Sequence, residues 1–102
     1  MDRLIVDHRD QIAALCRGLG VRRLEVFGSA ATGRFDRTSS DVDFLVEFAD
    51  LQQGEWADAY FGLKEGLEAL LGRPVDLVML AAVTNPYFRR GIEASRTMLY
   101  AA

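Results

Sequence analysis

Residues 40–48 read Ser-Asp-Val-Asp-Phe-Leu-Val-Glu-Phe, an apolar stretch that opens with two carboxylates. Aspartate has low strand propensity and is costly to remove from water, so an apolar strand that carries it usually gains something there. Asp41 and Asp43 lie two positions apart, and side chains at that spacing leave the same face of a strand. The stretch therefore predicts a partly buried strand over 42–48 with paired carboxylates at its start.

A third carboxylate stands in another apolar segment. Residues 75–80 read Val-Asp-Leu-Val-Met-Leu, which predicts a strand whose one polar residue is Asp76. Taken singly, each aspartate has an ordinary explanation: Asp41 caps the loop, Asp43 faces solvent, and Asp76 lies at a sheet edge. Three carboxylates crowded on one sheet face would instead repel one another and raise their pKa values unless cations neutralise them. Mg²⁺ is the simplest such cation, because it prefers hard oxygen ligands and leaves room for water and phosphate.

The strand predicted over 22–27 ends at Gly28 and Ser29. Glycine permits a positive φ and a close approach of phosphate to the backbone, and Ser29 can donate from its hydroxyl and its N–H. Gly-Ser is also common in plain turns, so by itself it indicates little. Beside an Asp-x-Asp on the next strand, it predicts a combined phosphate and metal site.

The remaining elements follow from apolar periodicity. Steps of three and four residues predict helices over 4–19, 56–70 and 86–99. Residues 30–40 are small and polar and read as a loop, either without regular structure or with one helical turn. The order helix, strand, loop, strand, helix, strand, helix predicts an α/β fold, a small mixed β-sheet packed with helices in one domain over 1–102.

Composition narrows the possible partners and compartment. The 102 residues carry a net charge of −3, which disfavours binding to nucleic acid by bulk phosphate attraction. Cys16 is alone, so no internal disulfide can form, which fits a reducing compartment. The first residues are too mixed for a signal peptide, and no apolar run approaches ~18 residues. We therefore expect a cytoplasmic protein without a membrane span.

Phe27-Gly28-Ser29, followed by Ser40-Asp41-Val42-Asp43 and by Asp76 on a later strand, resembles the DNA polymerase β-like nucleotidyltransferase superfamily. The small size resembles its minimal nucleotidyltransferase group, and residues 85–100 are similar to the end of those proteins. The resemblance implies the polymerase β-like nucleotidyltransferase fold. It also implies roles for six residues: nucleotide binding for Gly28, Ser29 and Ser40, and catalysis with ligation of two Mg²⁺ ions for Asp41, Asp43 and Asp76.

The resemblance further implies an activity and a partner. Such an enzyme transfers a nucleoside monophosphate, here AMP from ATP, to a hydroxyl and releases pyrophosphate. Members of the group act as antitoxins beside a HEPN-type toxin, whose tyrosine hydroxyl is the implied acceptor. The alternative is a non-catalytic antitoxin that neutralises its partner by binding alone. Transfer to a small molecule ranks last, because no second domain shapes an acceptor pocket.

One position departs from the family pattern. Thr32 stands where many members carry an arginine after the Gly-Ser turn. Arg34 or Arg37 could substitute for it, although surface arginines are more often simply solvated.

Overall fold

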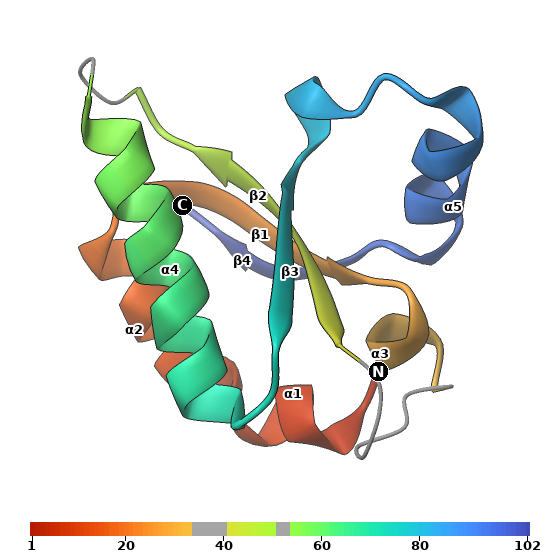
Figure 1. The fold of residues 1–102 in the computed structure, drawn as a ribbon. Coiled ribbons are helices and arrows are strands. Elements are labelled where there is room, and N and C mark those ends of the chain that lie inside the picture. The colour runs from red at the N-terminus through yellow and green to blue at the C-terminus, as the bar shows by residue number, and fades with distance from the viewer. Residues whose placement is uncertain (34–40, 51–53) are drawn as a thin grey trace.

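A computed structural model describes residues 1–33, 41–50 and 54–102, and Figure 1 shows a single sheet with helices on both sides. The strands are β1 (Val21–Phe27), β2 (Val42–Phe48), β3 (Val75–Met79) and β4 (Thr97–Ala101). The helices are α1 (Arg3–Asp7), α2 (Arg9–Gly18), α3 (Ser29–Thr32), α4 (Glu55–Leu71) and α5 (Pro86–Ser95), with a 3₁₀ turn at Leu80–Ala82. None of the helices in the described ranges is long and apolar enough to cross a membrane.

The sheet is mixed and has the strand order β3-β2-β1-β4. β1 pairs antiparallel with β2 on one side and with β4 on the other, whereas β2 and β3 run parallel. The connection from β2 to β3 passes through α4, as a parallel pair requires a crossover. The predicted small mixed sheet packed with helices is therefore confirmed.

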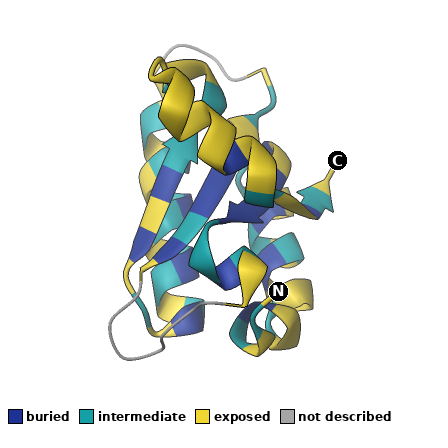
Figure 2. Cartoon of the chain, turned by 90° about the vertical axis from the view of Figure 1, so that its right-hand side faces the viewer, coloured by how far each residue is buried: buried dark blue, intermediate teal, exposed yellow. Residues whose placement is uncertain are grey.

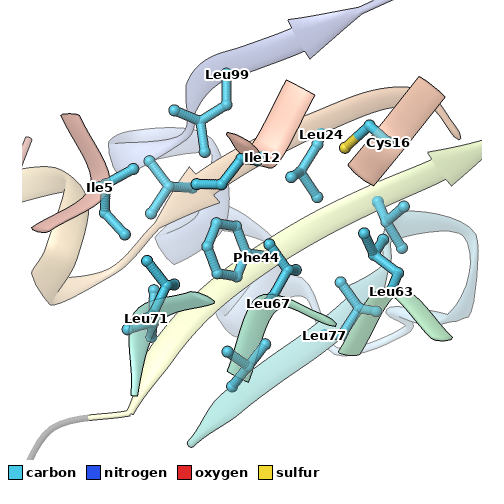
Figure 3. Packing of buried hydrophobic residues seen from close by; sticks show 14 of the residues in the cluster. Ile5, Ile12, Cys16, Leu24, Phe44, Leu63, Leu67, Leu71, Leu77 and Leu99 are labelled. Atoms are coloured by element: carbon cyan, nitrogen blue, oxygen red, sulfur yellow. The ribbon is translucent and has the colours of Figure 1, made fainter. Parts of the chain in front are cut away.

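One side of the sheet, here called the core face, carries the main hydrophobic core. It is formed by alternate strand residues such as Leu24, Phe44 and Leu77, which pack against α1, α2 and α4. Figure 3 shows Phe44 in the middle of this cluster, between Ile12 and Leu67. Phe44, Ile12 and Leu67 are fully buried, so this face supplies most of the apolar burial that stabilises the fold.

The lone cysteine belongs to this core. Cys16 lies on α2 and is fully buried, and burial raises the pKa of its thiol to about 12. The thiolate is the nucleophilic and metal-binding form of cysteine, so a raised pKa leaves the side chain inert.

The opposite side, here called the α5 face, is covered far less. A cluster of only three buried residues, Phe27, Leu45 and Ile92, joins α5 to β1 and β2. Phe88 adds an edge-to-face contact with Phe27, with ring centroids 6.3 Å apart. The rest of α5 is mostly exposed, as the yellow helix in Figure 2 shows, and Tyr87 is 77% exposed.

The structure corrects the predicted elements at three places. The first helix breaks at His8, whose ring nitrogen Nδ1 lies 2.8 Å from the Leu4 carbonyl, so α1 and α2 replace one helix over 4–19. The third strand ends at Met79, one residue earlier than predicted. The last helix ends at Ser95, and Leu99 lies on β4, a strand that the helical spacing had concealed.

Candidate active site

Two of the predicted carboxylates stand side by side on the sheet. In the parallel register of β2 and β3, Asp43 lies opposite Asp76. Their neighbours Val42, Phe44, Val75 and Leu77 belong to the core face, so both aspartates project from the α5 face. Adjacent strands are ~4.8 Å apart, which brings the two carboxylates within reach of a common ligand.

Burial and charge crowding together raise the pKa of Asp43. Burial is the main cause that raises the pKa of Asp43, from 3.8 to about 6, and the negative charges of Asp76 and then Asp41 raise it further. Asp41 directly precedes β2 and is exposed, as is Asp76, whereas Asp43 is half-buried. The three predicted carboxylates thus belong to one electrostatic neighbourhood, and Asp43 is its centre.

Gly28 lies directly against this carboxylate. Phe27 is the register partner of Asp43, and the chain turns at Gly28 with φ +72° and ψ −148°, a backbone region that is essentially restricted to glycine. A Cβ atom at Gly28 would lie 2.6 Å from Oδ2 of Asp43, closer than real Cβ contacts come. The turn can therefore approach Asp43 only because residue 28 has no side chain.

Ser29 begins the short helix α3 beside this turn and is partly exposed. No hydrogen bond from the described part of the chain holds its hydroxyl, which leaves that donor available to a ligand. Thr32, the departure from the family pattern, donates its hydroxyl to the Gly28 carbonyl at 3.3 Å, as does its N–H at 3.2 Å. Thr32 thus supports the turn itself. Ser40, Arg34 and Arg37 lie outside the described residues.

The donor set fits a hard divalent cation held in an open site. Within residues 1–33, 41–50 and 54–102, no three acidic, histidine or cysteine side chains are gathered closely enough to hold a metal ion together. Mg²⁺ commonly binds through one or two carboxylates and completes its shell with water and substrate phosphates. Asp43 and Asp76, with Asp41 nearby, match that kind of site.

A separate cavity of about 670 Å³ lies at the ends of β2 and β3 that are farther from the three aspartates. Its lining includes Phe48, Met79 and Trp56 and none of the three aspartates. The carboxylate site is therefore a surface site on the α5 face, distinct from this cavity.

The structure adds a residue that sequence reasoning did not place at the site. Ser95, on the last turn of α5, accepts a hydrogen bond from the Gly28 N–H at 2.9 Å. In the sequence, Ser95 is a polar residue at a position of the predicted apolar helix face, between Ile92 and Leu99. A polar residue on an apolar helix face indicates that its hydroxyl has a partner, but the sequence does not say which group that partner is.

Comparison with known proteins gives a consistent picture. The family model for the nucleotidyltransferase domain matches residues 8–99. A relative from Methanocaldococcus jannaschii, named as a candidate protein adenylyltransferase, is 37% identical over 73 residues, which are 72% of this chain and 71% of the relative. Protein adenylyltransferase MntA of Thermococcus cleftensis is 44% identical over 66 residues, 65% of this chain and 63% of that protein.

Solved structures agree with the sequence relatives. A structure described as a candidate minimal nucleotidyltransferase superposes with a TM-score of 0.75 at 34% identity and covers 95% of both chains. A chain from a toxin-antitoxin crystal structure with AMP-PNP superposes with a TM-score of 0.69 at 25% identity, over 92% of this chain and 73% of that one.

Proposed function

Because this chain belongs to the nucleotidyltransferase domain family, and within it is a minimal nucleotidyltransferase, we propose that it transfers AMP from ATP to a protein hydroxyl. The observation that carries the proposal is the pairing of Asp43 with Asp76 across two parallel strands, beside the Gly28 turn. The relatives named as protein adenylyltransferases support the choice of nucleotide and of acceptor class.

Asp41, Asp43 and Asp76 are the residues that would hold Mg²⁺, with two ions expected. When bound, such ions stabilise the negative charge on the entering and leaving oxygens of an in-line displacement. The raised pKa of Asp43 supports this assignment, because a group whose charge is disfavoured by burial and like-charged neighbours gains most from a cation.

Gly28 and Ser29 are proposed to bind the β- and γ-phosphates of ATP, together with Ser40. The Gly28 N–H is already donated to Ser95, so Gly28 contributes a backbone that phosphate can approach closely. Ser29 contributes the donor, because its hydroxyl has no partner within the described residues. A triphosphate bound by this turn would lie close to the Asp43 carboxylate.

In the transfer step, the acceptor hydroxyl oxygen bonds to the α-phosphorus as the bond to the bridging oxygen of the β-phosphate breaks. AMP becomes esterified to the acceptor, and pyrophosphate leaves with the bond electrons. The hydroxyl proton passes to a site carboxylate, for which Asp76 is proposed, and then to water. Because Asp76 is exposed, both the acceptor hydroxyl and water can reach its carboxylate.

The acceptor is proposed to be a tyrosine of a HEPN-type toxin, with this chain acting as its antitoxin. The similarity to a toxin-antitoxin chain in complex with AMP-PNP supports such a partner. The openness of the site also favours it, because Asp41 and Asp76 are exposed and can meet a hydroxyl on a macromolecular surface. A bulky charged nucleotide on the toxin would repel RNA from that surface.

The test combines the purified chain, Mg²⁺, ATP labelled on the α-phosphate, and a HEPN-type toxin as the acceptor protein. We expect label on that protein, and loss of labelling in Asp41→Asn and in Asp43→Asn while both variants keep their fold. Glu47→Gln is the matched control, because Glu47 is an exposed carboxylate on the same strand, paired with Arg22 and outside the site. It should label at the parent rate.

Two results would redirect the proposal. If the Asp→Asn variants still neutralise the partner and the parent transfers no label, the chain is an antitoxin that acts by binding alone. If label appears only on small hydroxyl compounds, the acceptor class is wrong and the transferase chemistry stands.

A further inference from the structure

The end of α5 meets the Gly28 turn through one hydroxyl. We propose that Ser95 is a positioning residue that fixes the orientation of the Gly28–Ser29 turn for ATP binding, an inference that rests on the proposed function. Ser95 lies 67 residues from Gly28 in the sequence, yet its Oγ accepts the Gly28 N–H at 2.9 Å. No other side-chain hydrogen bond in the described residues reaches the Gly28 N–H.

The direction of this hydrogen bond is set by a second one. The Ser95 hydroxyl donates its single proton to the Gly91 carbonyl one turn earlier in α5, at 3.1 Å. A serine hydroxyl has one proton and two lone pairs, so a lone pair remains for the Gly28 N–H. The pair of bonds therefore ties the peptide plane before Gly28 to the backbone of α5.

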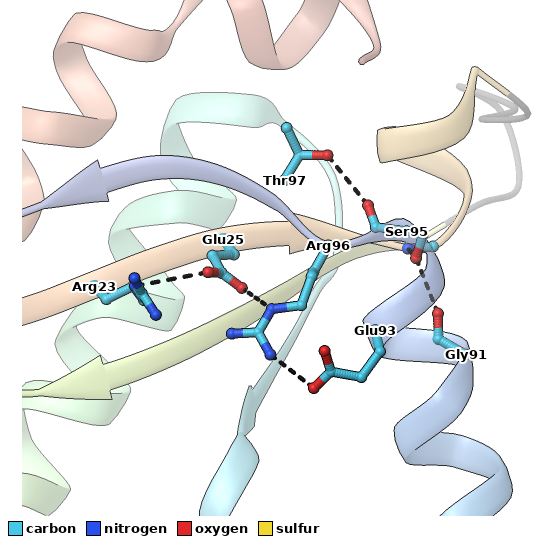
Figure 4. Close-up of polar contacts among 8 residues, drawn as sticks. Arg23, Glu25, Gly91, Glu93, Ser95, Arg96 and Thr97 are labelled. Carbon is cyan, nitrogen blue, oxygen red and sulfur yellow. Dashed lines mark hydrogen bonds and ion pairs between the residues drawn. The ribbon is translucent and has the colours of Figure 1, made fainter.

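The residues that follow Ser95 make further contacts, as Figure 4 shows. Thr97 donates its hydroxyl to the Ser95 carbonyl at 3.1 Å. Arg96 binds the buried Glu25 of β1 at 2.5 Å and Glu93 of α5 at 2.9 Å. The Arg96–Glu25 pair anchors the junction of α5 and β4 to β1, so Ser95 offers Gly28 a fixed acceptor, whereas the Thr97 bond stays within the junction and meets only the Ser95 carbonyl.

Gly28 needs such an acceptor on its N–H side, because the hydrogen bonds from Thr32 hold only the Gly28 carbonyl. Glycine populates positive φ readily and has no side chain that packs. The Gly28 backbone nevertheless lies against Asp43, where a Cβ would come within 2.6 Å of Oδ2. A rotation of this peptide would change the spacing between the Ser29 hydroxyl and the Asp43 carboxylate, and hence the fit of the triphosphate.

The experiment compares Ser95→Ala with Ser95→Thr, which keeps the hydroxyl, and with Ser95→Cys, whose sulfur is a weak acceptor. Thr97→Ala is the matched control, because it removes a hydroxyl at the same junction that does not contact Gly28. We expect the KM for ATP and the Kd of α,β-methylene-ATP, an analogue whose α–β linkage cannot be cleaved, to rise about 3- to 10-fold in Ser95→Ala, the range of one lost hydrogen bond. The kcat should change less, Ser95→Cys should be intermediate, and Ser95→Thr and Thr97→Ala should match the parent.

A second readout does not depend on activity. Amide hydrogen exchange at Gly28, followed by NMR without nucleotide, should be faster in Ser95→Ala and protected in the parent, Ser95→Thr and Thr97→Ala. Unchanged ATP affinity in Ser95→Ala, or an equal loss in Thr97→Ala, would overturn the proposal. If the parent binds no ATP at all, the proposed function fails instead, and the exchange data show whether Ser95 holds the turn.

Discussion

The two faces of the sheet are built in opposite ways. The core face buries a large cluster under α1, α2 and α4, whereas the α5 face has three buried apolar residues and a group of carboxylates. Neighbouring residues of β2 point to different faces: Phe44 is fully buried in the large core, and Asp43 is half-buried with a raised pKa. The fold is stabilised on one face, which leaves the other able to carry charges that oppose folding.

The largest expected effect compares the apolar burial on the two faces of the sheet within one strand, β2. Phe44→Ala should lower the free energy of unfolding by about 3–5 kcal/mol, because a large cavity opens in the main core. Leu45→Ala, on the next residue and the opposite face, should cost about 2 kcal/mol, the low end for such a change, since its small cluster can close around the gap. Urea denaturation measures both, and equal losses would show that the two faces contribute equally.

The next effect concerns charge on the α5 face. Arg96→Ala should cost about 2–3 kcal/mol, because Glu25, whose side chain is 6% exposed, would keep Arg23 at 3.7 Å as its one ion-pair partner among the described residues. Arg22→Ala is the matched control, since it breaks the exposed pair with Glu47 and should cost below about 1 kcal/mol. Similar losses in both variants would mean that burial does not strengthen the Glu25 pair.

A smaller effect isolates the contact between the turn and the carboxylate. Gly28→Ala should cost about 2 kcal/mol, since it places an alanine in a glycine-only backbone region and a Cβ against Asp43. Gly33→Ala should cost about 1 kcal/mol, because Gly33 also has a positive φ but no atoms within 4 Å of a Cβ. Thermal denaturation measures the loss of stability in each variant. If Gly33→Ala cost as much as Gly28→Ala, contact with Asp43 would not add to the cost at Gly28.

The smallest effect is a gain in stability and depends on pH. Burial and the charges of Asp76 and Asp41 raise the pKa of Asp43 from 3.8 to about 6 in the folded chain, and a chelator keeps any cation from lowering it. The folded state holds this proton more tightly, so the stability that Asp43 contributes is complete below about pH 3.8 and is lost as the pH rises through about 6. Asparagine does not ionise, so Asp43→Asn does not lose this stability as the pH rises. The variant should be about 1 kcal/mol more stable than the parent near pH 7.5, after allowance for solvent screening, and no more stable than the parent near pH 4.

Denaturant titrations at several pH values measure this difference. Parallel pH profiles for the parent and Asp43→Asn would show that the site does not oppose folding. Adding Mg²⁺ to the parent should recover part of the stability lost at neutral pH, and Asp43→Asn should respond less.

Much of this organisation could be predicted from local pattern. The apolar runs over 42–48 and 75–80 predict strands that the structure has at Val42–Phe48 and Val75–Met79, and the carboxylates stand out because aspartate is unusual in such runs. What the sequence could not supply was register. That Asp43 meets Asp76, and not a neighbouring residue, depends on how two parallel strands align across the α4 crossover.

The missed strand β4 has a related cause. Ile92, Ser95 and Leu99 follow helical spacing, but the chain leaves the helix after Ser95 and pairs with β1. This pairing is a contact between distant parts of the chain, which short-range periodicity does not report. The role of Ser95 was hidden for the same reason, because its partner Gly28 lies far away in the sequence.

The alignment of Asp43 with Asp76 has one more consequence. The two residues are spaced by the ladder of peptide hydrogen bonds between β2 and β3, with no loop between them in the sheet. Heating that frays the surrounding turns would leave their separation unchanged until the ladder itself comes apart. The spacing of Asp43 and Asp76 is thus as stable to heating as the backbone pairing of β2 with β3 that sets it.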